Sequence, residues 1–299
     1  MSPAGGLPFE LHGTLPALHQ PVLLVQLTGW IDASGAANAA MEHITRVTDS
    51  KELLTFDGDT FIDYRARRPV MELREGVNTR IVWGAPGLRV GTDGDGKDVV
   101  ILSGPEPDTA WRFFARTVGE LAAELGVTKM IALGAYPYGA PHTRPVGLSS
   151  TTPSETIAKR LRHARNSLDA PAGVAAVLEH ELHGRGIEAM GFWAQIPHYV
   201  ATMQFSAASI ALIDAVRGET GLVIDTTLLL EEAVSQRERL DNLIGGNPEP
   251  AEMISKLEQA YDAAFRPSAP QIATDLPSAE QLAEEIEKFL REQQSGDQQ

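Results

Sequence analysis

Short apolar runs alternate with amphipathic helical patterns through most of the chain, and this alternation limits the possible folds more than any other feature. The run at residues 21–27, PVLLVQL, is almost entirely apolar, as expected for a strand covered on both faces. The pattern from Ala33 to Val47 places small and apolar residues on one helical face, and Asp32 precedes it as a candidate N-cap. The alternation predicts an α/β domain with flanking helices and a mixed, largely parallel central sheet.

Further elements follow the same pattern. Strands are predicted at residues 53–56, 70–73, 80–83, 98–102, 129–133 and 187–194. Helices are predicted at 111–125, from a capping box of Thr152 and Glu155, at about 174–183 and at 202–216. Because some of the early strands are close in sequence, we expect antiparallel neighbours among them.

The composition changes near residue 223, beyond which only helical patterns remain, at about 227–243, 249–265 and 278–292. From Asp225 to the end, 16 acidic and 6 basic residues carry a net charge of −10 out of the total of −15. We therefore expect three parts. They are an α/β core domain over 1–222, an acidic helical subdomain over 223–292 and a flexible tail over 293–299.

The composition also excludes several classes of protein. The net charge of −15 repels nucleic acid phosphates and anionic membrane surfaces. The absence of cysteine excludes disulfides, thiolate zinc sites, iron–sulfur clusters and a cysteine nucleophile. The first basic residue is Arg46, so no basic segment precedes an apolar core as in a secretory signal, and no run approaches a membrane span of roughly 18 apolar residues. We expect a cytoplasmic protein that binds neither nucleic acid nor membrane.

Four predicted strands run into conspicuous loops, TGWID, SGPEPD, YPYGAPHTRP and QIPHY. If the strands are parallel, these loops share the sheet edge at which α/β proteins bind ligands. The candidate residues there are Trp30, Asp32, Glu106, Asp108, Tyr136, Tyr138, His142, Arg144, His198 and Tyr199. An arginine of this set could bind an anion and a histidine could move a proton. The competing interpretation, which we favour, is that these residues brace neighbouring loops or a subunit contact.

The stretch at residues 134–150, GAYPYGAPHTRPVGLSS, is predicted to be a rigid loop that closes the strand-end crevice. Pro137, Pro141 and Pro145 restrict its backbone at four-residue intervals. The glycines of the stretch, Gly134, Gly139 and Gly147, permit tight reversals. Such a loop holds its side chains in place.

Other motifs give no reaction. In EHELHG the histidines, His180 and His183, are three residues apart rather than the four of a zinc protease helix. GTDGDGKD at residues 91–98 departs from a calcium loop and predicts a hairpin turn. Arg65, Arg67 and Arg68 predict a solvated basic cluster. Since the chain has neither a P-loop nor a G-x-S-x-G elbow, we expect no cofactor and no metal.

Taken in order, the motifs LTGWIDASGAAN, DYRARRP, GAYPYGAPHTRPV and GFWAQIPHYV resemble the proteasome assembly chaperone 2 family, in particular its bacterial branch. The resemblance covers about residues 10–220, with a weaker match through the helical tail. It implies a core like that of the nucleoside phosphorylase and hydrolase superfamily, a homo-oligomer such as a trimer, and binding to proteasome subunits or other proteins. Its signature positions here are Trp30, Asp32, His142, Arg144, Pro145, Pro197, His198 and Tyr199.

The resemblance brings no catalytic residues, because none is established for the family's chaperones. Some members end in a hydrophobic residue, a tyrosine and one more residue, which docks into proteasome pockets. This chain ends Gly-Asp-Gln-Gln and does not match that tail.

Two functions follow as hypotheses. The leading one is a proteasome-assembly-chaperone-like protein without catalytic activity, because no nucleophile, cofactor loop or metal cluster is recognisable. The alternative is a phosphorylase- or hydrolase-type enzyme that uses the strand-end crevice around His142, Arg144 and His198.

Overall fold

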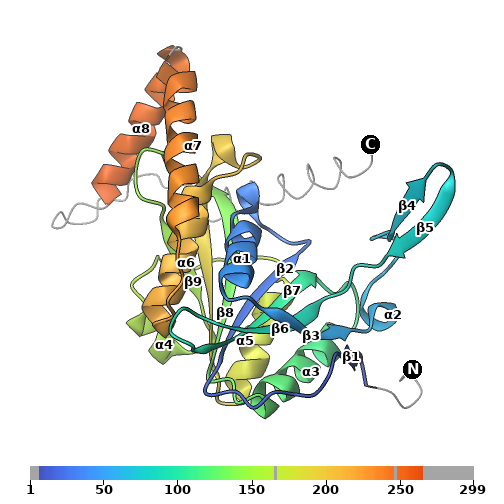
Figure 1. Cartoon of the computed structure of the whole chain (residues 1–299). Coiled ribbons are helices and arrows are strands. Elements are labelled where there is room, and N and C mark those ends of the chain that lie inside the picture. Colours follow the sequence, from blue (N-terminus) through green and yellow to red (C-terminus); the bar gives the residue numbers. More distant parts are fainter. Residues whose placement is uncertain (1–6, 165–166, 246–247, 265–299) are drawn as a thin grey trace.

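An eight-stranded mixed sheet with helices on both faces forms the centre of the molecule (Figure 1). The structure is a computed structural model that describes residues 7–164, 167–245 and 248–264. The strand order is β1-β3-β6-β7-β2-β8-β10-β9, and β4 and β5 form a separate hairpin.

The strands are β1 (Phe9–Leu11), β2 (Val22–Thr28), β3 (Lys51–Phe56), β4 (Val70–Arg74), β5 (Val77–Val82), β6 (Gly87–Thr92), β7 (Asp98–Pro105), β8 (Lys129–Tyr138), β9 (Leu148–Thr151) and β10 (Glu188–Pro197). The α-helices are α1 (Ala36–Val47), α2 (Gly58–Phe61), α3 (Trp111–Glu124), α4 (Glu155–Arg160), α5 (Val174–Gly184), α6 (Ser206–Thr220), α7 (Thr227–Gly245) and α8 (Pro248–Ala264). Two short 3₁₀ turns, η1 (Ala33–Gly35) and η2 (His198–Val200), follow β2 and β10.

Parallel pairing is confined to the middle of the sheet. Strands β7, β2, β8 and β10 are parallel neighbours, whereas the pairings beyond them at both edges are antiparallel. The prediction of an α/β fold with a mixed sheet is confirmed, and its parallel part consists of these four strands. All four end at the same edge of the sheet, which is where the predicted loops emerge.

The central strand β2 explains why the sheet is covered on both faces. Its side chains alternate, so that Val22 and Leu24 join one buried cluster and Leu23 and Val25 join the other. Helices α1 and α6 cover the first face, and α3 and α5 cover the second. The apolar run at 21–27 therefore forms a fully buried strand, as predicted.

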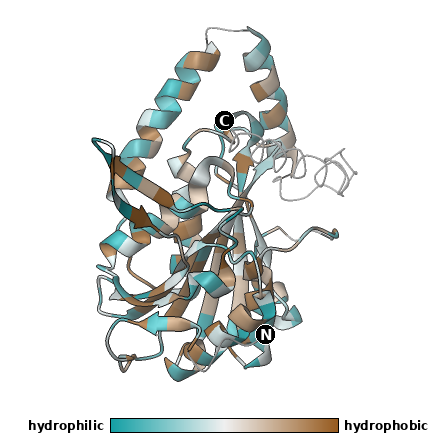
Figure 2. Ribbon diagram, turned by 90° about the vertical axis from the view of Figure 1, so that its right-hand side faces the viewer, coloured by the Kyte–Doolittle hydropathy of each residue, from teal (hydrophilic) through white to brown (hydrophobic). Residues whose placement is uncertain are grey.

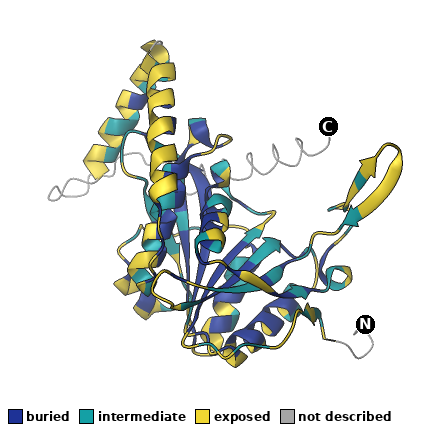
Figure 3. Ribbon diagram, in the orientation of Figure 1, coloured by how far each residue is buried: buried dark blue, intermediate teal, exposed yellow. Residues whose placement is uncertain are grey.

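Two parts project from this body. The β4–β5 hairpin extends away from the sheet, and α7 and α8 rise above it and diverge from their junction (Figures 1 and 2). Hydrophobic and hydrophilic residues alternate along both helices in Figure 2. Most of the hairpin and much of α7 are exposed (Figure 3). The inner face of α7 nevertheless packs on the body, since Leu229 and Leu240 belong to the buried cluster beside α6.

Several predicted boundaries were wrong. Strand β8 continues to Tyr138, and β10 to Pro197, so the loop after β8 covers only residues 139–147. Helix α4 begins after Ser154, whose hydroxyl accepts a hydrogen bond from the Ile157 N–H at 3.4 Å. Thr152, the predicted cap, instead donates a hydrogen bond to the Ala189 carbonyl at 2.7 Å.

Other predictions hold. The hairpin turn predicted within residues 91–98 is present at 93–97, between β6 and β7, and α3 and α5 match their predicted ranges within two residues. The helix predicted at 278–292 and the tail at 293–299 lie outside the described residues. In the described parts of the chain, no helix is both long and apolar enough to cross a membrane.

Candidate functional site

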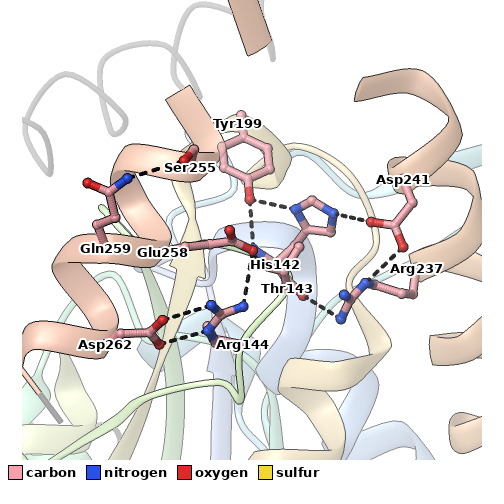
Figure 4. Close-up of polar contacts among 10 residues, drawn as sticks. All are labelled: His142, Thr143, Arg144, Tyr199, Arg237, Asp241, Ser255, Glu258, Gln259 and Asp262. Carbon is pink, nitrogen blue, oxygen red and sulfur yellow. Dashed lines mark hydrogen bonds and ion pairs between the residues drawn. The ribbon is translucent and has the colours of Figure 1, made fainter. Parts of the chain in front are cut away.

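The loop at residues 139–147 leaves β8 and joins the body to α7 and α8. Pro141 and Pro145 restrict its backbone, and the three side chains between them, His142, Thr143 and Arg144, all contact one of the two helices. Figure 4 shows these contacts together. A rigid loop suits this position because it fixes three polar side chains at once.

His142 is the most buried polar residue of the loop, with only 4% of its surface exposed. Its Nδ1 lies 2.8 Å from the hydroxyl of Tyr199 in η2, and its Nε2 lies 3.1 Å from Oδ1 of Asp241 in α7 (Figure 4). Its backbone N–H donates to the same hydroxyl at 2.7 Å. All three bonds are satisfied when Nε2 carries the proton, the Tyr199 O–H donates to Nδ1 and Nε2–H donates to Asp241.

The surroundings shift the acidities of both partners. Burial raises the pKa of the Tyr199 hydroxyl to about 12, so this group stays protonated and keeps its proton for His142. Burial alone would raise the pKa of Asp241, but hydrogen bonds from His142 and Arg237 outweigh it and hold the pKa below its usual value. The histidine therefore lies between a neutral hydroxyl and an ionised carboxylate.

Arg144 forms the second half of the contact. Its guanidinium binds Asp262 of α8 through Nε and Nη2, both at 2.8 Å, and it binds Glu258 through Nη1 at 3.0 Å (Figure 4). The paired hydrogen bonds with Asp262 raise the pKa of Arg144 further above its usual value. Thr143 donates a hydrogen bond to Glu258 as well, and the hydroxyl of Tyr261 donates to the Pro145 carbonyl at 3.0 Å.

We call this set the latch. It consists of His142, Thr143, Arg144, Tyr199, Arg237, Asp241, Glu258 and Asp262. Its members come from the loop after β8, from η2 and from both projecting helices. The geometry agrees with bracing between neighbouring elements, the interpretation that the sequence favoured.

The residues of the enzyme hypothesis already have partners within the protein. Arg144 is already bound by two carboxylates, which compete with any anionic ligand, and both ring nitrogens of His142 are engaged. His198 is exposed on η2 and packs its ring edge-on to Tyr199, with 5.3 Å between the ring centroids. His142 and His198 thus both contact the ring of Tyr199, whereas Arg144 is held by the carboxylates of α8.

Asp32 and Trp30 lie elsewhere on the same edge. The N-cap residue of α1 is Gly35 and not Asp32 as predicted, but the carboxylate of Asp32 still accepts hydrogen bonds from the first turn of α1, from the N–H groups of Ala37 at 2.8 Å and Asn38 at 2.9 Å. Burial raises the pKa of this carboxyl to about 6. Asp32 thus stabilises the first turn of α1, while Trp30 lines a cavity.

That cavity lies beside the carboxyl-terminal halves of β2 and β8 and has a volume of about 340 Å³. Trp30, Tyr136 and Trp193 line it together with Glu106 and the N-terminal residues of α5. Glu106 and Tyr136 were among the candidate residues, but Trp193 was not. Its signal was hidden, because Trp193 belongs to an apolar run that predicts only a buried strand.

The remaining motifs have structural explanations. Glu179, from EHELHG, points into the interior and accepts a hydrogen bond from the Thr151 hydroxyl at 2.8 Å. Across the described ranges, no group of three or more histidine, aspartate or glutamate side chains could hold a metal ion. Arg67 is not simply solvated, since it pairs with Asp108 at 2.9 Å and binds the Thr28 carbonyl at 3.1 Å.

Comparisons with known proteins agree with this arrangement. The model of the PAC2 family matches residues 26–244. A Mycobacterium tuberculosis structure described as a proteasome-assembly chaperone homologue is 29% identical, covering 78% of this chain and 99% of its own, with a TM-score of 0.72.

Two proteins of unknown function match over more of the chain. One from Corynebacterium glutamicum is 29% identical over 86% of this chain and 99% of its own, with a TM-score of 0.80. Another from M. tuberculosis is 28% identical over 98% of this chain and 99% of its own, with a TM-score of 0.81. No curated protein matches the chain.

Proposed function

Because the chain belongs to the PAC2 family, we propose that it is a proteasome-assembly-chaperone-like protein that acts by binding other proteins and has no catalytic activity. The observation that carries this proposal is the likeness to the M. tuberculosis proteasome-assembly chaperone homologue, which extends over nearly the whole of that relative. The proposed partners are proteasome subunits and further copies of this chain. We place its action in the cytoplasm, in keeping with a chain that has no cysteine.

The surface supports a protein-binding role. Large apolar side chains are exposed on both projecting parts, where contacts with another protein would not be blocked by the body. On the hairpin they are Val70, Met71, Leu73 and Val77, and on α7 they are Leu228, Leu230, Val234 and Leu243. Burying such side chains against a partner stabilises a complex by about 25 cal/mol per Å² of apolar area.

The latch supports the same role indirectly. It fixes the loop after β8 to α7 through the hydrogen bond between His142 and Asp241, and to α8 through the ion pairs of Arg144, so the helices are presented in one orientation. A preset orientation lowers the conformational entropy lost when a partner binds. The enzyme alternative gains no comparable support, because two of its three residues, His142 and Arg144, are engaged within the latch.

Affinity capture tests the proposal. The tagged chain is recovered from its native cell and the bound proteins are identified by mass spectrometry. We expect proteasome subunits with the wild-type chain, and a marked loss of them with the hairpin variant Val70→Thr, Leu73→Thr, Val77→Thr. A matched control, Arg74→Thr with Asn78→Thr, changes exposed polar residues of the same hairpin and should keep the partners.

The outcome that opposes the proposal is equally clear. If no proteasome subunit is recovered from a cell that makes proteasomes, the assembly role is wrong and only the shared fold remains, which does not establish function.

A further inference from the structure

The cavity beyond β2 and β8 has the size and lining of a small-molecule site. Its volume of about 340 Å³ falls in the range of ligand pockets, and most of its lining is apolar. It also lies at the carboxyl ends of two adjacent parallel strands, where open α/β sheets bind their ligands. It is separate from the latch, because the set of lining residues contains none of the latch residues.

One charged group faces this apolar space. Glu106 lines the cavity and is only 6% exposed. Among the described residues its carboxyl makes one hydrogen bond, in which Oε1 accepts from the Val174 N–H at the start of α5 at 2.6 Å. Burial raises the pKa of Glu106, as expected for a carboxylate without a paired cation beside it.

The nearest candidate cation for Glu106 is already engaged. Arg67 influences Glu106 through its charge, but its guanidinium is bound to Asp108 and to the Thr28 carbonyl, and Asp108 opposes its effect. The described residues that line the cavity include no lysine, arginine or histidine. The described lining residues therefore carry a negative charge, which disfavours an anionic ligand such as phosphate.

Aromatic rings surround the same space. Trp30, Tyr136 and Trp193 pack into one cluster at the cavity wall. The wall is also tightly built, because a Cβ at Gly173 would lie 2.8 Å from Trp30 and 3.0 Å from Glu106. Aromatic faces attract organic cations as well as apolar bodies.

From this juxtaposition of a buried carboxyl with an aromatic, apolar enclosure, we propose that the cavity binds a small organic amine, with its ammonium group at Glu106 and its apolar body among Trp30, Tyr136 and Trp193. The ammonium group supplies the counter-charge that the described lining residues lack. This site is independent of the proposed assembly function, and its test involves no protein partner.

The test compares three probes of matched shape on the full chain by calorimetry at pH 8. They are 2-phenylethylamine, its neutral isostere 2-phenylethanol and the anion 3-phenylpropanoate. We expect the amine to bind at least tenfold more tightly than the alcohol, and the anion not to bind. In Glu106→Gln the advantage of the amine over the alcohol should vanish, whereas the exposed control Glu124→Gln should keep it.

A second variant protects the test against misfolding of the first. Ala176→Leu adds volume to the cavity wall from α5 and should weaken the amine and the alcohol alike. The comparison of the probes on the wild-type chain needs no variant at all. The proposal is overturned if the amine and the alcohol bind equally, if the amine does not bind at millimolar concentration, or if a folded Glu106→Gln protein keeps the tenfold preference.

Discussion

His142 connects three elements through a single buried ring, so its removal should be costly. In His142→Ala, the Tyr199 hydroxyl and Asp241 each lose one partner, and the space of the ring is left empty. We expect a loss of about 2 kcal/mol in the free energy of unfolding, measured by urea denaturation. The matched control is His198→Ala, an exposed histidine, which should change the free energy by less than about 0.5 kcal/mol. If the two variants were equally stable, the claim that the hydrogen bonds of His142 stabilise the fold would be wrong.

Glu179 gives a prediction for the pH dependence of stability. Burial raises its pKa in the folded protein from the usual 4.5 to about 7. The folded state therefore binds the proton more tightly than the unfolded state, so this group contributes stability below pH 4.5 that is lost as the pH rises towards 7. Replacement by glutamine removes this loss and retains an oxygen for the Thr151 hydroxyl.

Between pH 5 and pH 8, the free energy of unfolding of Glu179→Gln should consequently rise by about 2 kcal/mol relative to that of the wild-type chain. Urea denaturation at both pH values measures this gain, with the exposed Glu124→Gln as control. A difference in stability that stays constant over this range would show that the carboxyl titrates normally.

At the scale of single elements, the attachment of α8 to the loop depends on Arg144. Without its guanidinium, Asp262 and Glu258 lose their shared cation and repel each other. In Arg144→Ala we expect severalfold faster hydrogen exchange of the α8 amides, with the amides of α6 unchanged. Arg239→Ala serves as the control, because Arg239 bonds only to Ser235 of its own helix among the described residues. Unchanged protection of α8 would mean that other contacts hold the helix.

The errors in predicted elements have identifiable causes. Gly134 and Pro137 resemble the start of a loop, yet both lie inside β8. Gly134 is needed there because the ring of Trp193 on the neighbouring strand occupies the space of a side chain. The glycine and proline thus led to a predicted strand that ended too early, whereas pairing with β10 extends β8 to Tyr138. Strand β2 was predicted correctly, because its nearly all-apolar run contains no glycine or proline to suggest an earlier end.

The projecting helices α7 and α8 correspond to the predicted acidic helical subdomain. We propose that the acidic helical subdomain begins at residue 223, where α6 has ended and α7 is about to start. Leu229 and Leu240 bury against the body, so the subdomain shares its core and is not expected to separate from it.

For the whole molecule, the sequence predicted the layers and the edge at which the loops gather. It did not predict which loops belong to the latch and which to the cavity. His142, Arg144 and Tyr199 were singled out together, and the structure joins the loop and η2 that carry them. Their acidic partners on α7 and α8 could not be identified, because a helix rich in carboxylates offers many equivalent candidates. The cavity was also beyond prediction, since its wall combines residues from β2, β8, β9, β10 and α5.

The assembly state is a further prediction at this scale. We expect a homo-oligomer, with a trimer as the first candidate, because apolar side chains remain exposed on the hairpin and on α7. Light scattering at micromolar concentration should give a multiple of the 32.2 kDa chain mass. A mass of a single chain would refute the oligomer.

The central claim is that the protein assists proteasome assembly by binding subunits. The most direct measurement is the yield of assembled particles from separately purified proteasome subunits of the same cell, followed on native gels with and without this chain. Our account predicts faster or more complete assembly at stoichiometric amounts of the chain, and loss of this effect with Val70→Thr, Leu73→Thr, Val77→Thr. Assembly that proceeds identically without the chain, with no complex between chain and subunits, would contradict it.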